Sequence, residues 1–508
     1  MTNGIHPKLK NLIIILASLI FWAVILQSIP MEFYDLGGDS AQYIILAENL
    51  SQGKGWHMVN YPGEPLSNLP PIFPLLLAPI LYFFGRNFWL MHLAVCILAY
   101  ISLMLFYKIF RQDSPEEVAI LAIFLLAING LFLSYSLRIL SDIPFLFLSG
   151  FTLYFLIKYR QKQIALSREG GLTAIGFVTA YLCRYVGIFL FFIGVFYLLS
   201  EKANSLEKKG QIKKILFLSL GFLPIFLFWN FRNLCIYNPF ITSPENYKPY
   251  LRLLTLNPFI LMSRFINGIN FYFFRIAETT FFIYKIRSLI LQDMLLITIV
   301  IIILTGLWSE IKKKKYAFTF YVVIYLTLIS LWPHYEDGRY IIPILPFILF
   351  YFSIGFYKIL NTFPKKISTY LFIGSLFYFL ISLSSSLPVH KSSLEELSPH
   401  FKNFISLHKW IEKNLPPSGL IISRKPTVTY FFTNHKSTGY PFTLNPDEIW
   451  KSLLQHDAKY ILVDEFSRET YYYLSPFLYK YKNKLILVYR IGNTGLFEIR
   501  KWGEFGLP

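Results

Sequence analysis

The sequence is dominated by apolar blocks of roughly twenty residues, which are separated by short charged segments. A helix of about twenty residues spans the ~30 Å hydrocarbon layer of a membrane. Hydrophobic residues make up 55% of the 508 residues and charged residues only 15%, too few charges for a soluble chain of this length. The blocks therefore predict a protein with many transmembrane helices.

About eleven blocks qualify as candidate spans. They lie near residues 11–29, 88–109, 118–134, 144–158, 171–183, 185–200, 214–229, 291–309, 316–332, 341–358 and 369–385. The first block has no small-residue cleavage pattern after it, so we interpret it as a retained span. A further apolar segment, residues 71–85, is short and contains Pro71, Pro74 and Pro79. We interpret it as a re-entrant or interfacial segment.

The distribution of basic residues predicts the orientation of the chain. The formal net charge is +19, but Lys and Arg lie mainly in short loops between alternate blocks. This asymmetry is the one that membrane insertion produces, with the basic loops in the cytoplasm. Basic clusters occur near residues 8–10, 108–111, 158–168, 202–214, 312–315 and 358–366. We therefore expect an integral protein of a bacterial cytoplasmic (inner) membrane, with a cytoplasmic N-terminus, and we exclude nucleic acid as a partner.

The pattern changes after Ser384. An amphipathic helix is expected at residues 394–414 and another helix at 447–456. Short apolar runs at 420–423, 460–464 and 485–489 are typical of strands. We predict a mainly α fold, with a transmembrane helix bundle at residues 1–390 and an extracytoplasmic α/β domain at residues 391–508.

Two carboxylates are expected on the extracytoplasmic side. Asp39 precedes Tyr43, Ala47 and Leu50, which share one face at helical spacing, so it belongs at a helix N-terminus. Asp142 stands at the start of the fourth span, and Pro144 suits the first turn of that helix. Helix capping explains each carboxylate separately. Capping does not explain why both lie on one side together with several arginines.

Four arginines are expected on the same side as these carboxylates: Arg138, Arg184, Arg232 and Arg339. Arg184 interrupts the apolar stretch 171–199, which suits a hairpin of two short spans with the arginine at its tip. A charge so close to the bilayer is costly, and it indicates a functional site. The alternatives are contact with phospholipid headgroups for Arg184, and a local ion pair with Glu336 or Asp337 for Arg339.

The motifs resemble those of membrane glycosyltransferases with the C-type (GT-C) fold, in the protein O-mannosyltransferase and lipid A aminoarabinose transferase superfamily. Asp39-x-x-x-Tyr43-x-x-x-Ala47, followed by Pro70-Pro71-x-x-Pro74, is similar to the first-loop signature of this group. Asp142-x-Pro144 resembles the second carboxylate. Arg184, Arg339-Tyr340-x-x-Pro343 and Trp229-x-x-Arg232 resemble further elements. The chain has Leu69 where aminoarabinose transferases carry a lysine.

The resemblance implies transfer of a sugar from a polyprenyl-phosphate donor to an envelope acceptor, which is a glycolipid such as lipid A, a glycan or a protein. Asp39 is then the base, and Asp142 is either a carboxylate that positions the acceptor or an auxiliary carboxylate. Arg184 and Arg339, followed by Arg138 and Arg232, bind the donor phosphate. Tyr43 and Tyr340 contact substrate. No cofactor is expected: the two carboxylates leave room for a divalent metal, but no ligand cluster in the sequence argues for one.

Three other functional classes stay open at this point. A transporter or flippase for a lipid-linked saccharide usually places its ionisable residues near the bilayer midplane, within repeated halves. An oligosaccharide polymerase or ligase also uses lipid-linked sugars and outer loops. A non-catalytic scaffold or sensor is the third alternative. The gathering of charges at one membrane face favours the transferase.

Overall fold

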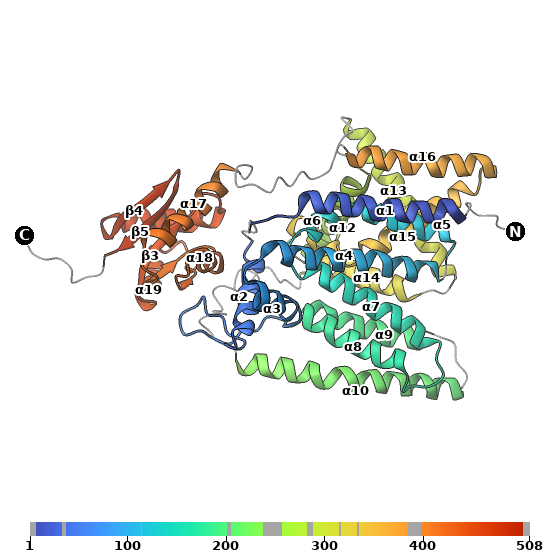
Figure 1. Cartoon of the computed structure of the whole chain (residues 1–508), viewed down its shortest axis with the longest axis horizontal. Coiled ribbons are helices and arrows are strands. Elements are labelled where there is room, and N and C mark those ends of the chain that lie inside the picture. The colour runs from blue at the N-terminus through green and yellow to red at the C-terminus, as the bar shows by residue number, and fades with distance from the viewer. Residues whose placement is uncertain are drawn as a thin grey trace, which may run out of the picture.

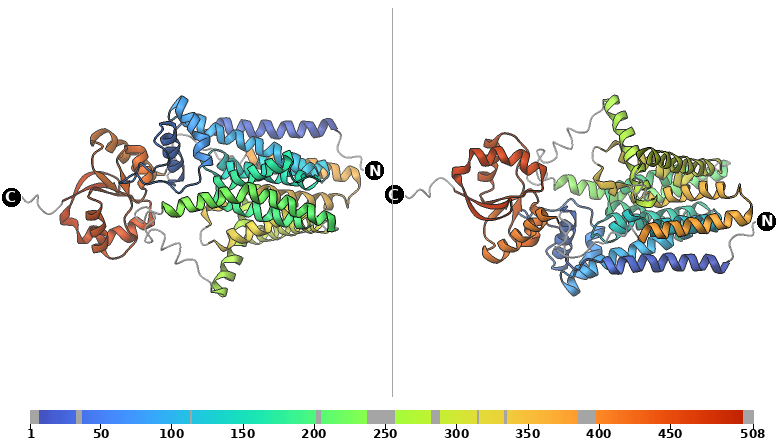
Figure 2. Two further views of the ribbon diagram at one scale, coloured as in Figure 1. Left: turned by 90° about the horizontal axis from the view of Figure 1, so that it is seen from below. Right: turned by 90° about the horizontal axis from the view of Figure 1, so that it is seen from above.

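The structure, a computed structural model, describes residues 7–32, 37–112, 114–200, 205–236, 257–281, 288–313, 316–332, 335–384 and 398–500. A long helix bundle is followed by a small domain that contains a five-stranded sheet (Figure 1). The small domain lies at one end of the bundle, and helix α1 begins at the other end (Figure 2). If the bundle crosses a membrane, these two features lie on opposite sides, in agreement with the charge pattern. Which side is cytoplasmic stays a prediction.

Helices occupy all the segments that were predicted as spans. They are α1 (Pro7–Ser28), α4 (Phe88–Arg111), α5 (Glu116–Ala127), α6 (Gly130–Ser136), α7 (Asp142–Arg160), α8 (Arg168–Cys183), α9 (Ile188–Leu199), α10 (Ser205–Cys235), α13 (Leu289–Lys312), α14 (Tyr316–Leu331), α15 (Leu345–Leu360) and α16 (Lys365–Ser384). Within the described residues, five helices are long and apolar enough to cross a membrane alone, and α5 and α6 together form a sixth candidate bent by 60°. The number of spans, about eleven, stays a prediction.

Two segments outside the predicted spans are also helical. Helix α3 (Ile72–Phe84) covers the proline-rich segment and lies beside α2 (Asp39–Ser51), at the end of the bundle nearest the small domain (Figure 1). Helix α12 (Pro258–Phe281) falls between the predicted spans at residues 214–229 and 291–309, where no span was predicted. Its buried residues Gly268, Tyr272 and Ile276 share one face. Polar residues between the apolar ones hid this amphipathic helix from a search for continuous apolar blocks.

Helices α13 and α15 pack with their backbones unusually close. A Cβ atom added at Gly306 would overlap the carbonyl of Tyr351, and one added at Gly355 would overlap the carbonyl of Ile302. Small residues allow this close approach, which is a common way for membrane helices to associate without a hydrophobic driving force. The contact holds α15, whose N-terminal end follows the segment that carries Arg339.

We expect Gly355→Ala to lower the stability of the bundle by about 1–3 kcal/mol, because the added methyl group forces two backbones apart. Gly374 on α16 is the matched control, since nothing lies within 4 Å of a Cβ atom added there. Gly374→Ala should be neutral or stabilising by about 0.5–1 kcal/mol. Thermal unfolding of the purified protein in detergent measures both. Equal melting temperatures for the two variants would contradict the close packing.

The C-terminal domain has a mixed sheet with strand order β2-β1-β3-β5-β4. Strands β1 and β2 pair in parallel, as do β1 and β3, whereas β5 pairs antiparallel with both β3 and β4. The elements are α17 (Pro399–Asn414), β1 (Leu420–Ile422), α18 (Pro426–Thr433), β2 (Ser437–Thr438), α19 (Pro446–Gln455), β3 (Ala458–Val463), α20 (Ser475–Lys480), β4 (Leu485–Ile491) and β5 (Thr494–Ile499). The predicted strands and helices are present. The predicted domain boundary, residues 390–391, lies outside the described residues.

Hydrogen bonds and ion pairs fasten this domain to the segment 37–86. The backbone N–H of Ser437 donates to the carbonyl of Asn60 (2.8 Å). Arg86 donates to the Phe431 carbonyl (3.2 Å) and also bonds both carboxylate oxygens of Glu48. These contacts set β2 against the chain at Asn60 and α18 against α2, at the end of the bundle.

His408 is a buried titratable group within the C-terminal domain. Its ring contacts the Phe404 carbonyl (2.7 Å) and the Thr429 hydroxyl (3.1 Å), and the residue has no exposed surface. Burial lowers the pKa of His408 from 6.5 to about 4. The folded domain therefore holds this histidine neutral at a pH where an unfolded chain would protonate it.

This difference predicts how the stability of the domain depends on pH. Stability is complete above the unfolded pKa of about 6.5 and falls as the pH drops toward about 4, by roughly 3 kcal/mol in total, because only the unfolded chain takes up the proton. Hydrogen exchange in residues 398–500 of the full-length protein, corrected for intrinsic rates, measures the loss. His408→Gln should remove most of the pH dependence. An unchanged dependence in this variant would show that another group is responsible.

Candidate active site

Asp39 is the first residue of α2, as the spacing predicted. The preceding Gly38 has a φ of 104°, a conformation that favours glycine, and it lets the chain turn sharply into the helix. The side chain of Asp39 is 49% exposed, and its Oδ2 accepts from Nη1 of Arg339 at 2.8 Å. Asp39 is therefore a carboxylate that is held by a cation on one side and accessible on the other.

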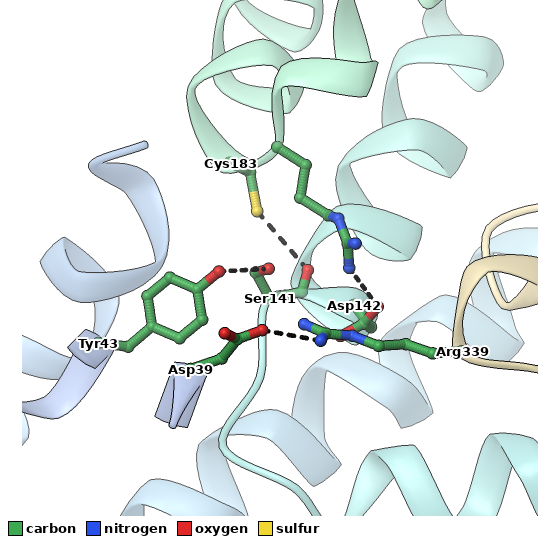
Figure 3. Close-up of polar contacts among 7 residues, drawn as sticks. Asp39, Tyr43, Ser141, Asp142, Cys183 and Arg339 are labelled. Carbon is green, nitrogen blue, oxygen red and sulfur yellow. Dashed lines mark hydrogen bonds and ion pairs between the residues drawn. The ribbon is translucent and has the colours of Figure 1, made fainter. Parts of the chain in front are cut away.

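Asp142 is the first residue of α7 and is almost completely buried, with 1% of its side chain exposed. Its Oδ2 accepts from Nε of Arg339 at 2.9 Å, and its Oδ1 accepts from Nη1 of Arg184. Figure 3 shows both Asp39 and Asp142 facing the guanidinium of Arg339. The two carboxylates and two arginines form a cluster with a formal charge of zero, which we call the charged cluster.

The two arginines come from distant parts of the chain. Arg184 lies between α8 and the 3-10 turn η1 (Tyr185–Gly187), and Arg339 lies in the 3-10 turn η3 (Glu336–Ile341). The turn after Arg184 depends on Gly187, where an added Cβ would lie 2.6 Å from the backbone of Ala180. Burial alone would lower the pKa of Arg339, but Asp142 and Asp39 raise it further than burial lowers it. The guanidinium therefore stays charged.

Tyr43 contacts protein groups beside the charged cluster. The residue is 8% exposed, and its hydroxyl lies 3.0 Å from Oγ of Ser141. Burial, together with the charge of Asp39, raises the pKa of Tyr43 to about 12, so the phenol stays protonated. The thiol of Cys183 points to the Ser141 carbonyl (Figure 3). Tyr43 thus ties α2 to the segment before α7. The sequence patterns had not drawn attention to Ser141.

The other predicted phosphate-binding arginines contact groups outside the charged cluster. Arg232, on α10, donates to the Ser67 carbonyl (2.9 Å) and lies over the ring of Trp229. Arg138 lies over the ring of Tyr135. Tyr340 is half-buried and packs against the bundle core. Within the described residues, no group of three or more His, Cys, Asp or Glu could hold a metal ion.

A half-open pocket of roughly 240 Å³ extends from Asp39 to the C-terminal domain. Its far wall contains Arg424 and Lys425, in the turn between β1 and α18. Sequence analysis missed these two residues. The sequence does carry a signal, because adjacent basic residues follow a predicted strand directly, and loops at strand ends commonly form binding sites.

We compared the sequence and the structure of the chain with those of known proteins. Residues 68–229 match the model of the dolichyl-phosphate-mannose-protein mannosyltransferase family. The structure of ArnT from Cupriavidus metallidurans bound to undecaprenyl phosphate aligns with a TM-score of 0.56 and 12% identity, over 96% of this chain and 97% of that chain. The chain has the GT-C fold of the protein mannosyltransferase and ArnT type.

A second solved structure agrees with the first. The oligosaccharyltransferase AglB from Archaeoglobus fulgidus, in complex with an inhibitory peptide and a dolichol-phosphate, aligns with a TM-score of 0.62 and 12% identity, over 98% of this chain and 75% of that chain. No curated protein matches the sequence. At these identities the solved structures show the shared fold, and the family model adds a sequence pattern across residues 68–229. The GT-C fold that the motifs predicted is confirmed.

The burial of Asp142 predicts a difference between the two carboxylates. Asp142→Asn leaves two arginines without their buried counter-ion and should destabilise the protein by about 3–5 kcal/mol. Asp39→Asn removes a half-exposed partner and should cost about 1 kcal/mol or less. Melting temperatures in detergent compare the two variants directly. If Asp142→Asn melted like the wild type, Asp142 would not be the counter-ion that holds the cluster.

Proposed function

We propose that the protein is a glycosyltransferase that moves a sugar from a polyprenyl-phosphate donor to an acceptor of the cell envelope, on the extracytoplasmic face and with inversion. The observation that carries the proposal is the charged cluster: a half-exposed carboxylate, Asp39, lies 2.8 Å from an arginine that a buried carboxylate also holds. This arrangement places a proton acceptor beside cations, as displacement of a phosphate by a hydroxyl group requires.

Asp39 is the proposed base. As the acceptor oxygen attacks the anomeric carbon of the donor sugar, Asp39 takes the proton of the attacking hydroxyl. The bond from the anomeric carbon to the phosphate oxygen breaks, and its electron pair leaves with the polyprenyl phosphate. The exposed half of the Asp39 side chain supports this assignment, because an acceptor can approach it from solvent.

Arg184 and Arg339 are the proposed partners of the leaving phosphate. Each guanidinium carries five N–H donors in a planar fork, a geometry that suits bidentate contact with a phosphate. Asp142 acts in this proposal as the buried counter-ion that positions both arginines. Its burial favours this role over direct contact with the acceptor. The arginines supply the positive charge at the leaving group, so the proposed mechanism needs no metal.

The relatives support the choice of donor. The ArnT structure contains undecaprenyl phosphate, and the AglB structure contains a dolichol-phosphate. A chain that shares their fold and carries two arginines in one charged cluster is suited to the same class of lipid phosphate. The acceptor that we propose is an envelope glycolipid, a glycan or a protein.

The direct test is turnover of polyprenyl-phosphate monosaccharides by the purified protein in detergent. Release of polyprenyl phosphate, together with labelled product in an envelope extract, is the expected result, and it should persist when EDTA is added. A transporter would move the lipid-linked sugar across a vesicle membrane without breaking the bond from sugar to phosphate. Absence of bond cleavage with every donor sugar would refute the proposed function.

Asp39→Asn tests the base. Asparagine caps a helix about as well as aspartate, so the fold should survive. The rate should fall by about 10²–10⁴-fold, because the amide cannot accept the proton. Asp447→Asn is the control, since Asp447 is an exposed carboxylate that pairs with Lys480 in the C-terminal domain. Near-normal turnover by Asp39→Asn would remove Asp39 as the base.

Arg184→Ala and Arg339→Ala test the phosphate contacts. Each variant removes a charge-assisted contact, which is worth about 1.5–3 kcal/mol, or roughly ten- to a hundredfold in rate. The corresponding lysine variants should recover only part of the loss, because lysine lacks the planar fork. Turnover of the donor is measured at equal amounts of folded protein. Normal rates in both alanine variants would exclude these arginines from the reaction.

A further inference from the structure

The pocket beside Asp39 is built by two domains. One wall belongs to the segment that leads into α2, and the other to the turns of the C-terminal domain around β1, β2 and α18. The lining residues that matter for its chemistry are Asp39, Arg424, Lys425, Thr427, Val428 and Phe442. Among them, Asp39 is shared with the charged cluster. The pocket therefore approaches the proposed base from the side of the C-terminal domain.

The charge of this pocket is positive. Its lining contains two cations, Arg424 and Lys425, and one carboxylate, Asp39, which already pairs with Arg339. Arg424 reaches Glu469 at 3.4 Å, a pair whose side chains are 23% and 42% exposed. Glu469 also interacts electrostatically with Lys425 and so offsets part of the charge of both cations. Such a partly exposed ion pair contributes little to stability, so an anionic ligand can compete with Glu469 for the arginine.

Neighbouring groups hold both cations at the pocket. The guanidinium of Arg424 lies over the ring of Phe442, 4.9 Å from its centroid. Lys425 donates from Nζ to the Gly37 carbonyl at 3.2 Å, across the domain boundary. Lys425 is also the N-cap residue of α18, and its side chain provides no cap. Thr427 and Val428, in the first turn of this helix, line the same pocket, and the positive end of the helix dipole adds to its preference for an anion.

We propose that this pocket binds an anionic group, a phosphate or a carboxylate, carried by the acceptor, and that Arg424 is the residue that selects it. The inference rests on the proposed function, in which Asp39 takes the proton of the acceptor. An acceptor anchored at Arg424 and Lys425 places its hydroxyl groups along the pocket toward Asp39. The donor phosphate then has its own cations, Arg184 and Arg339, in the charged cluster. The C-terminal domain thus contributes directly to acceptor specificity.

The test is binding to the full-length protein in nanodiscs, with two probes that differ in one group. Octyl glucoside 6-phosphate carries the anion and octyl glucoside does not. We expect the wild type to bind the phosphorylated probe about ten- to a hundredfold more tightly, as a charge-assisted contact predicts. Arg424→Gln should remove most of this preference, and Lys425→Gln should reduce it. Equal binding of the two probes, or an unchanged preference in Arg424→Gln, would overturn the proposal.

Glu469→Gln is the matched control, because it breaks the same ion pair and leaves the cation in place. This variant should keep or increase the preference. Loss of the preference in Glu469→Gln as well as Arg424→Gln would show that the ion pair shapes the domain and that Arg424 binds no anion.

A competition experiment separates acceptor from donor. Saturating polyprenyl phosphate should leave binding of the phosphorylated probe unchanged, and displacement would mean that the pocket holds the donor phosphate instead. Binding is measured without turnover. The anion site and the proposed glycosyltransferase activity can therefore be refuted independently of each other. A preference for the anionic probe in a protein that cleaves no donor would refute the glycosyltransferase and retain the anion site.

Discussion

The buried carboxylate of Asp142 is the interaction on which the architecture of the site depends. A single ionised group with 1% exposure is unfavourable unless opposite charges reach it, and here two arginines do. These arginines come from the α8–η1 hairpin and from η3, and Arg339 also bonds Asp39 on α2. One buried charge therefore determines the relative positions of four segments. Each arginine in turn keeps its charge and its orientation at the end of the bundle.

The same arrangement separates the two carboxylates by environment. Asp142 is enclosed and accepts from both arginines, whereas about half of the Asp39 side chain reaches solvent. The buried Asp142 is suited to act as a counter-ion, and the accessible Asp39 is suited to act as a base. The difference in burial separates the two roles. The C-terminal domain lies on the exposed side of Asp39. Its contacts with the segment 37–86 bring Arg424 and Lys425 to the pocket that Asp39 lines.

Patterns that are local in the sequence predicted the fold well. Apolar blocks and helical spacing located most helices of the bundle, and short apolar runs located strands β1, β3 and β4 of the C-terminal domain. Strands β2 and β5 were not predicted. Helix α12 was missed because its apolar residues lie on one face only. The interaction of Arg232 with the Ser67 carbonyl was also missed, since an arginine near a membrane face gives no indication of whether it will bind a ligand or a loop.

The sequence by itself determined the membrane character, the expected sidedness and the candidate residues Asp39, Asp142, Arg184 and Arg339. Hydropathy and charge are properties of individual residues. Membrane spans and orientation can therefore be predicted from them without knowledge of the fold. Only the tertiary structure decided which of these residues touch, which carboxylate is buried, and that Arg424 lines the same pocket as Asp39. Asp39 and Arg339 are 300 positions apart, and their contact exists because helix packing brings α2 and η3 to the same end of the bundle. Packing of that kind depends on the whole chain at once, and no local pattern encodes it.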